Sequence, residues 1–188
     1  MNVLVLLGSL RDGSTNRTLA EAAVAHLPEG ATATFFNSGA DLPHYSEDLD
    51  VEGRVPQVAT ELREAVTAAD ALIVVTPENN GTLSSVVKNS IDWASRPREA
   101  ASIHGKQAIV LAASGAPYGA EWARKDAVRT LQIAGAQVVE DTFGIGASYE
   151  AFADGRLVDG GRRQPAPGPR RAPRHARRRL THARPPSL

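Results

Sequence analysis

The sequence contains no cysteine, and its five histidines show no metal-ligand spacing. The missing thiols exclude disulfides and thiolate zinc sites, a composition typical of a reducing compartment. The N-terminal segment MNVLVLLGSLR has no basic residue before its apolar run, which is only five residues long. Such a run is too short for the core of a signal peptide or for a membrane span. We therefore expect a cytoplasmic protein without a membrane partner.

The whole chain also has no formal net charge, because its 21 Lys and Arg residues balance its 21 Asp and Glu residues. This balance hides two different regions. Residues 1–159 carry 12 basic and 21 acidic residues, a net charge of −9, whereas residues 160–188 carry nine arginines and no acid. A chain of 188 residues suits one domain with a full core. We expect that domain over residues 1–159 and a separate basic tail over 160–188.

The tail is rich in arginine and proline and has no apolar periodicity. It holds half of the twelve prolines, and a segment of this composition cannot bury a core, so we expect disorder. Arginines can bind phosphates of nucleic acid, but no aromatic residue is present there for base stacking, so no specific nucleic-acid partner is expected. A reading-frame artefact is an alternative, because Arg, Pro, Ala and Gly dominate GC-rich DNA translated out of frame.

Within residues 1–159, aliphatic runs alternate with amphipathic segments. The runs predict strands buried on both faces, and the periodic segments predict helices. The expected strands are residues 3–7, 32–37, 71–76, 107–113 and 137–143. The expected helices are residues 16–27, 55–69, 84–94 and 119–135. This alternation predicts an α/β fold with a doubly wound parallel sheet, in which ligands bind beyond the carboxyl ends of the strands.

The first loop at that edge is GSLRDGSTNR, residues 8–17. Because it leads into a helix, its amides can form an anion site at the helix N-terminus. Its hydroxyl, amide and guanidinium groups suit a terminal monophosphate, and neither the dinucleotide pattern G-x-G-x-x-G nor a P-loop is present. The loop by itself fits an ordinary polar turn equally well, with Ser14 or Thr15 as the helix N-cap.

The second and third loops follow the strands expected at 71–76 and 107–113. The second, TPENNGTLSS, contains a strong turn signal, and its backbone N–H and C=O groups could bind the edge of a flat heterocycle. The third, SGAPYGAEW, is rich in glycine and carries one tyrosine. Each alone also fits a plain connection between strand and helix. Their convergence on one edge of one sheet favours a shared site.

Three motifs occur in order along the chain: GSLRDGSTNRTLA, TPENNGTLSSVVKNSIDWASRP and LAASGAPYGA. Together with LPHYSEDLD (42–50), they resemble the NADPH-dependent FMN reductase family of flavodoxin-like proteins. The resemblance covers about residues 2–159. It implies a three-layer α/β sandwich around a five-stranded parallel sheet of order 2-1-3-4-5. It also implies a homodimer or homotetramer that binds FMN and passes hydride from NADPH or NADH to quinone-type or other small acceptors.

The resemblance assigns cofactor contacts to all three loops. They are Ser9, Leu10, Arg11, Ser14, Thr15 and Asn16 in the first loop, Pro77, Glu78, Asn79, Asn80 and Gly81 in the second, and Ser114 and Gly115 in the third. The first set would hold the FMN phosphate, and the second would lie along the isoalloxazine. No catalytic side chain is implied, because the flavin itself accepts the hydride.

The chain departs from the family pattern at two places. Asn79 stands where the family usually has tyrosine, so an aromatic contact near the flavin is lost. The family's final helix is replaced by the tail, which would leave apolar surface of the sheet and first helix uncovered. Two alternatives to a reductase therefore stay open: a flavodoxin-type FMN electron carrier, and a reductase remnant with a defective C-terminus.

Overall fold

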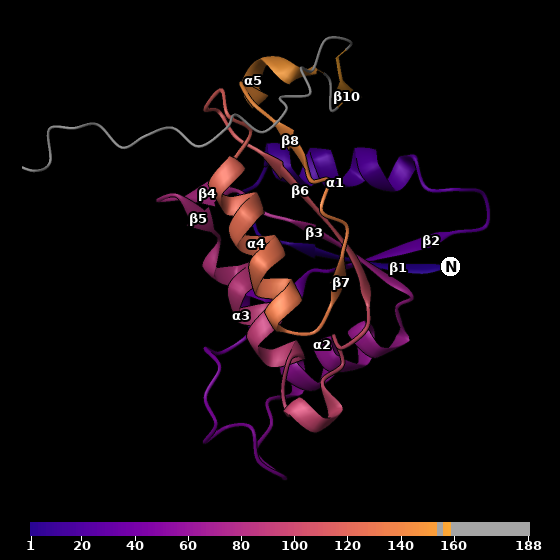
Figure 1. Ribbon diagram of the computed structural model, residues 1–188, viewed down its shortest axis with the longest axis vertical. Coiled ribbons are helices and arrows are strands. Elements are labelled where there is room, and N and C mark those ends of the chain that lie inside the picture. Colours follow the sequence, from indigo (N-terminus) through magenta and orange to yellow (C-terminus); the bar gives the residue numbers. More distant parts are fainter. Residues whose placement is uncertain (154–155, 159–188) are drawn as a thin grey trace, which may run out of the picture.

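The computed structural model describes residues 1–153 and 156–158. Its centre is a parallel sheet of order β2-β1-β3-β6-β7, in which β8 also pairs with β6 (Figure 1). The strands are β1 (Asn2–Leu7), β2 (Thr32–Phe36), β3 (Ala71–Val75), β6 (Gln107–Ala113), β7 (Gln137–Val138) and β8 (Phe143–Ile145). The predicted α/β fold and strand order are confirmed, with β7 and β8 sharing the fifth position.

The register of the central strands brings the starts of the three loops to the same edge of the sheet. Leu7 lies opposite Val75, and Val75 lies opposite Leu111, so β1, β3 and β6 approach the same edge together. The apolar runs form these strands because their side chains are buried on both faces of the sheet. The loops that follow β1, β3 and β6 therefore meet at one end of the molecule.

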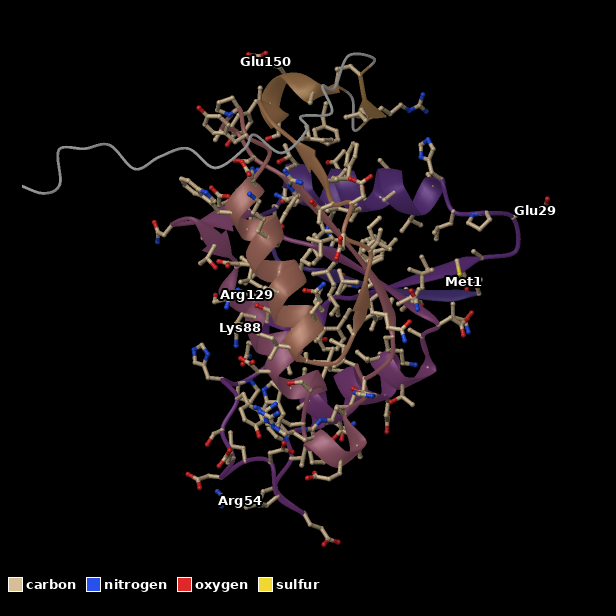
Figure 2. The ribbon with its side chains drawn as sticks, in the orientation of Figure 1. Met1, Glu29, Arg54, Lys88, Arg129 and Glu150 are labelled. Carbon is tan, nitrogen blue, oxygen red and sulfur yellow. The ribbon has the colours of Figure 1, made fainter. Side chains whose placement is uncertain are left out.

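Helices cover the two faces of the sheet unequally. The core of one face includes side chains of α2 (Gln57–Ala68), α3 (Ser85–Ala94) and α4 (Glu121–Ile133). The other face has α1 (Thr15–Ala25) and the four-residue α5 (Ser148–Ala151). Figure 1 shows α1 and α5 above the sheet and α2 and α3 below it, and the side chains in Figure 2 fill the space between the layers. The four predicted helices are confirmed, with no end shifted by more than two residues.

Short elements complete the described chain. They are the 3-10 turns η1 (Ser38–Ala40) and η2 (Arg98–Ala100), and the strands β4 (Glu78–Asn79), β5 (Thr82–Leu83), β9 (Phe152–Ala153) and β10 (Arg156–Leu157). The pairs β4–β5 and β9–β10 are antiparallel, and β4–β5 forms a hairpin. In this part of the chain, no helix has the length and apolar character needed to cross a membrane.

The single strand expected over residues 137–143 is wrong, because the chain leaves the sheet between β7 and β8. The buried guanidinium of Arg124 on α4 binds there: its Nη1 donates to the Thr142 hydroxyl at 2.5 Å. A Cβ at Gly144 would lie 2.5 Å from Arg124 Nε, so glycine leaves room for this side chain. A residue of another element thus contacts the chain between the two strands, a contact that residues 137–143 do not reveal by themselves.

An apolar groove of about 710 Å³ lies beside α1 on the less covered face. It is lined by Leu19, Ala22, Ala23, His26, Ile109, Leu111, Asp141, Thr142, Phe143, Gly144 and Leu157. Within the described residues, this groove is apolar surface of the kind expected on the sheet and the first helix. The expected tail at 160–188 lies outside the described residues.

Candidate functional site

A pocket of about 440 Å³ opens where the loops after β1, β3 and β6 meet. Most of its lining residues carry hydroxyl, amide or charged groups or are small. They are Gly8, Ser9, Leu10, Arg11, Ser14, Thr15, Asn16, Pro77, Glu78, Asn79, Ser84, Ser85, Val86, Ala113, Ser114, Gly115, Ser148 and Tyr149. The structure therefore brings the three predicted loops together around one cavity.

Two predicted contacts, Asn80 and Gly81, do not line this pocket. They form the tip of the β4–β5 hairpin, with φ of 51° and 80°. An Asn-Gly pair suits such a two-residue turn because both positions require positive φ. The turn signal in this loop is thus confirmed, while the pocket is bordered by the hairpin's first strand, Glu78–Asn79.

The first loop contains both a helix N-cap and hydrogen-bond donors that can bind an anion. Ser14 is the N-cap of α1, and its buried Oγ accepts a hydrogen bond from the backbone N–H of Asn16 at 3.2 Å. The guanidinium of Arg11 is exposed and donates only a 3.4 Å hydrogen bond to the carbonyl of Asp12 within the described chain. Of the two N-cap candidates, Ser14 and Thr15, the structure uses Ser14. The positive end of the α1 dipole and Arg11 favour an anion at this end of the pocket.

Asn16 joins the first loop to the end of β6. Its Nδ2 donates to the carbonyl of Ala113, and its Oδ1 accepts from the Ala113 N–H, both at 2.8 Å. The side chain is buried, with 4% of the residue exposed. Because Ala113 directly precedes Ser114, this pair of hydrogen bonds sets the distance between the first and third loops.

The second loop packs closely on the first. Thr76 Oγ1 accepts from the backbone N–H of Ser84 at 3.0 Å, which closes the loop across the hairpin. Ser84 then caps α3, accepting from Val87 N–H at 3.4 Å. A Cβ at Gly8 would lie 2.3 Å from Ser84 Oγ, so only glycine allows this approach. The floor of the pocket is therefore a direct contact between the loops after β1 and β3.

Ser148 and Tyr149, which follow β8, also line the pocket, and sequence reasoning missed both. The Thr15 hydroxyl donates to Ser148 Oγ at 3.4 Å. Tyr149 covers the third loop, since a Cβ at Gly115 would lie 2.7 Å from its ring. No periodic pattern marks this segment in the sequence. Ser84 and Ser85 were also missed, although a serine before an amphipathic run is a recognisable capping signal.

The polar groups around the pocket fit a flavin monophosphate. Hydroxyls, a guanidinium and the N-terminus of α1 lie at the end formed by the first loop, where they can bind a phosphate. The strand Glu78–Asn79 and the loop at Ser114 supply backbone groups at the other two sides. Gly8 and Gly115 stand where a side chain would collide with a neighbouring wall. The pocket thus combines an anion end with sides that can bind a flat ring by its edge.

Comparisons with known proteins agree with this geometry. The family model described as NADPH-dependent FMN reductase matches residues 1–150. An NAD(P)H-dependent FMN reductase of Pseudomonas aeruginosa is 37% identical over 161 residues, covering 85% of each chain. A quinone reductase of Pseudomonas putida is 34% identical, covering 84% of this chain and 85% of its own.

A solved structure supports the same relationship. FerB, a flavoenzyme NAD(P)H:(acceptor) oxidoreductase of Paracoccus denitrificans, superposes with a TM-score of 0.72 at 31% identity. The match covers 84% of this chain and 86% of FerB. By its matched sequence, its flavodoxin-like fold and its three-loop pocket, this chain belongs to the NADPH-dependent FMN reductase family.

Proposed function

We propose that residues 1–159 form a reductase domain that takes hydride from NADPH or NADH through bound FMN and delivers it to a quinone or another small acceptor. The convergence of three polar loops into one pocket carries this proposal. It is supported by the family assignment and by relatives named quinone reductase and NAD(P)H:(acceptor) oxidoreductase.

The residues of the pocket bind and orient rather than transfer protons. Ser9, Arg11 and Thr15 would hold the phosphate together with the amides of α1. The backbone of the strand Glu78–Asn79 and of Ser114 would hold the ring by hydrogen bonds at its edge. FMN, when bound, supplies the hydride-accepting chemistry. The polypeptide is then required chiefly to fix the ring and leave one face accessible.

The direct test is a visible spectrum of the full chain reconstituted with FMN. Anaerobic addition of NADPH or NADH should bleach the bound flavin, and a quinone should restore its absorbance. A flavin that stays oxidised with both nucleotides but is reduced by dithionite would instead indicate an electron carrier. A chain that neither folds cooperatively nor retains FMN would indicate a defective remnant.

The proposal includes a homodimer or homotetramer in the cytoplasm, without a specific nucleic-acid or membrane partner. Exposed apolar side chains on α4 support self-association: Trp122 is 65% and Ile133 74% exposed. Light scattering coupled to size exclusion should show a mass of two or four chains. A monomer at micromolar concentration would contradict this part of the proposal.

A further inference from the structure

Helix α4 begins without a capping side chain of its own. Its N-cap is Ala120, which has a φ of 54° and makes no side-chain cap hydrogen bond. The cap comes from the second loop: Glu78 Oε2 accepts the backbone N–H groups of Trp122 and Ala123 at 3.1 and 3.2 Å. A carboxylate at this position satisfies two first-turn amides and interacts favourably with the helix dipole.

The rest of the β4–β5 hairpin is also held on α4. The Thr82 hydroxyl donates to Asp126 Oδ2 at 2.7 Å, and this hydrogen bond lowers the pKa of Asp126. The indole of Trp122 lies beside the hairpin tip, where a Cβ at Gly81 would be 3.4 Å from Cε3. Both strands of the hairpin and its tip therefore contact α4.

Helix α4 also holds the third loop of the pocket. Arg124 is only 5% exposed, and its Nε donates to the carbonyl of Gly119 at 2.9 Å. Burial lowers the pKa of this guanidinium, while the carboxylates of Glu121 and Glu78 act in the opposite direction. Because α4 is tied to the loop after β6 and capped by Glu78 after β3, one carboxylate joins two sides of the pocket.

We propose that Glu78 is a positioning residue for the flavin ring. Its carboxylate caps α4 and thereby holds the backbone of the β4–β5 hairpin at a set distance from the loop that begins at Ser114. The inference rests on the proposed function, because it assigns the ring, not the phosphate, to the space between these loops. Glu78 would then act on flavin affinity through the hairpin and the helix.

The test compares four variants of the full chain. Glu78→Ala removes the cap, and Glu78→Gln keeps one carbonyl acceptor without the charge. Thr82→Val loosens the hairpin without touching the cap. Glu64→Gln is the matched control, because Glu64 is exposed on α2, away from the pocket. Two quantities are measured: hydrogen exchange of the Trp122 and Ala123 amides in the apoprotein, and the Kd of FMN and of riboflavin.

In Glu78→Ala, these amides should exchange roughly tenfold faster, and both flavins should bind roughly tenfold more weakly, by the same factor. Glu78→Gln should recover part of each change. Thr82→Val should weaken both flavins while leaving the exchange rates as in the wild type. The Glu64→Gln control should match the wild type in every measurement.

Several results would overturn the proposal. Unchanged exchange in both Glu78 variants would show that the carboxylate does not cap α4. Faster exchange with unchanged flavin affinity would show a cap without a positioning role, and a loss confined to FMN would assign Glu78 to the phosphate. If Glu78→Ala does not fold, Glu78→Gln decides by the same criteria. A wild-type chain that binds no flavin would contradict the proposed function itself and, with it, the positioning role of Glu78.

Discussion

Arg11 and Asn16 lie in the same loop, yet the structure uses their side chains differently. Arg11 is exposed at the pocket, and its one hydrogen bond in the described chain is a long one to its neighbour Asp12. Asn16 is buried and bonds both backbone groups of Ala113. Arg11 can therefore turn to a ligand at little cost, whereas Asn16 holds two loops together. Sequence reasoning placed both in one phosphate-binding set.

Replacing Arg11 by alanine should weaken FMN binding roughly ten- to hundredfold and riboflavin binding little, because only FMN carries the phosphate. Titration of both flavins into the apoprotein measures the difference. Arg17→Ala is the control, since Arg17 bonds Asn37 and does not line the pocket. Equal losses for FMN and riboflavin in Arg11→Ala would show that Arg11 does not bind the phosphate.

Asn16→Ala should weaken FMN and riboflavin alike and also lower the free energy of unfolding by about 1–3 kcal/mol, because two backbone groups of Ala113 lose their partners. Urea unfolding of the apoprotein measures this loss. Asn37→Ala, at an exposed position, should change stability much less. A stable Asn16→Ala chain with a selective loss of FMN would instead make Asn16 a phosphate ligand.

At the scale of elements, hydrogen bonds hold residues 42–50, which follow β2, against α2 and α3. Trp93 of α3 is fully buried, and its Nε1 donates to the carbonyl of Pro43 at 2.8 Å. Arg63 of α2 forms two hydrogen bonds with the carboxylate of Asp50, at 2.8 and 2.7 Å, and its Nε donates to the Trp93 carbonyl. The motif LPHYSEDLD, which the resemblance singled out, therefore packs against two helices.

The Asp50–Arg63 pair makes stability depend on pH. The hydrogen bonds from Arg63 lower the pKa of Asp50 from its usual value. A carboxylate with a lowered pKa stabilises the fold above the unfolded-state pKa, about 3.9, and this contribution is lost as the pH falls through the folded-state pKa. Asp50→Asn should therefore cost about 2 kcal/mol at neutral pH and progressively less below about pH 4.

Chemical unfolding across this pH range checks the prediction. Asp48→Asn is a suitable control, because Asp48 is exposed in the same loop and forms no ion pair within the described chain. A stability loss in Asp50→Asn that stays constant down to pH 2 would show that the Asp50–Arg63 pair is not its cause.

At the scale of the whole molecule, the two faces of the sheet differ in their cover. Three helices pack on one face, whereas α1 and the short α5 leave the groove beside β8 apolar and open in the described chain. Such a groove should bind an apolar dye such as ANS in the native state. Ala22→Lys, within the groove, should abolish most of the fluorescence enhancement.

The same substitution at Ala25 is the matched control, because Ala25 is exposed on α1 and does not line the groove. Ala25→Lys should leave dye binding unchanged, and unfolding curves should show both variants folded. Dye binding that is equal in the two variants would show that the dye binds outside the groove, and no binding to the wild type would show that the groove is covered in solution.

The sequence by itself determined the parallel sheet, its helices and the meeting of three loops at one edge. Aliphatic runs and helical periodicity are local signals, and parallel connections place the loops at the carboxyl ends of the strands. Only the tertiary structure decided which partner each polar side chain takes. Asn16 bonds Ala113, 97 positions away, Glu78 caps a helix 44 positions away, and Arg124 bonds Thr142 between β7 and β8. A hydrogen bond between distant elements depends on how they pack, and no local pattern in the chain records that packing.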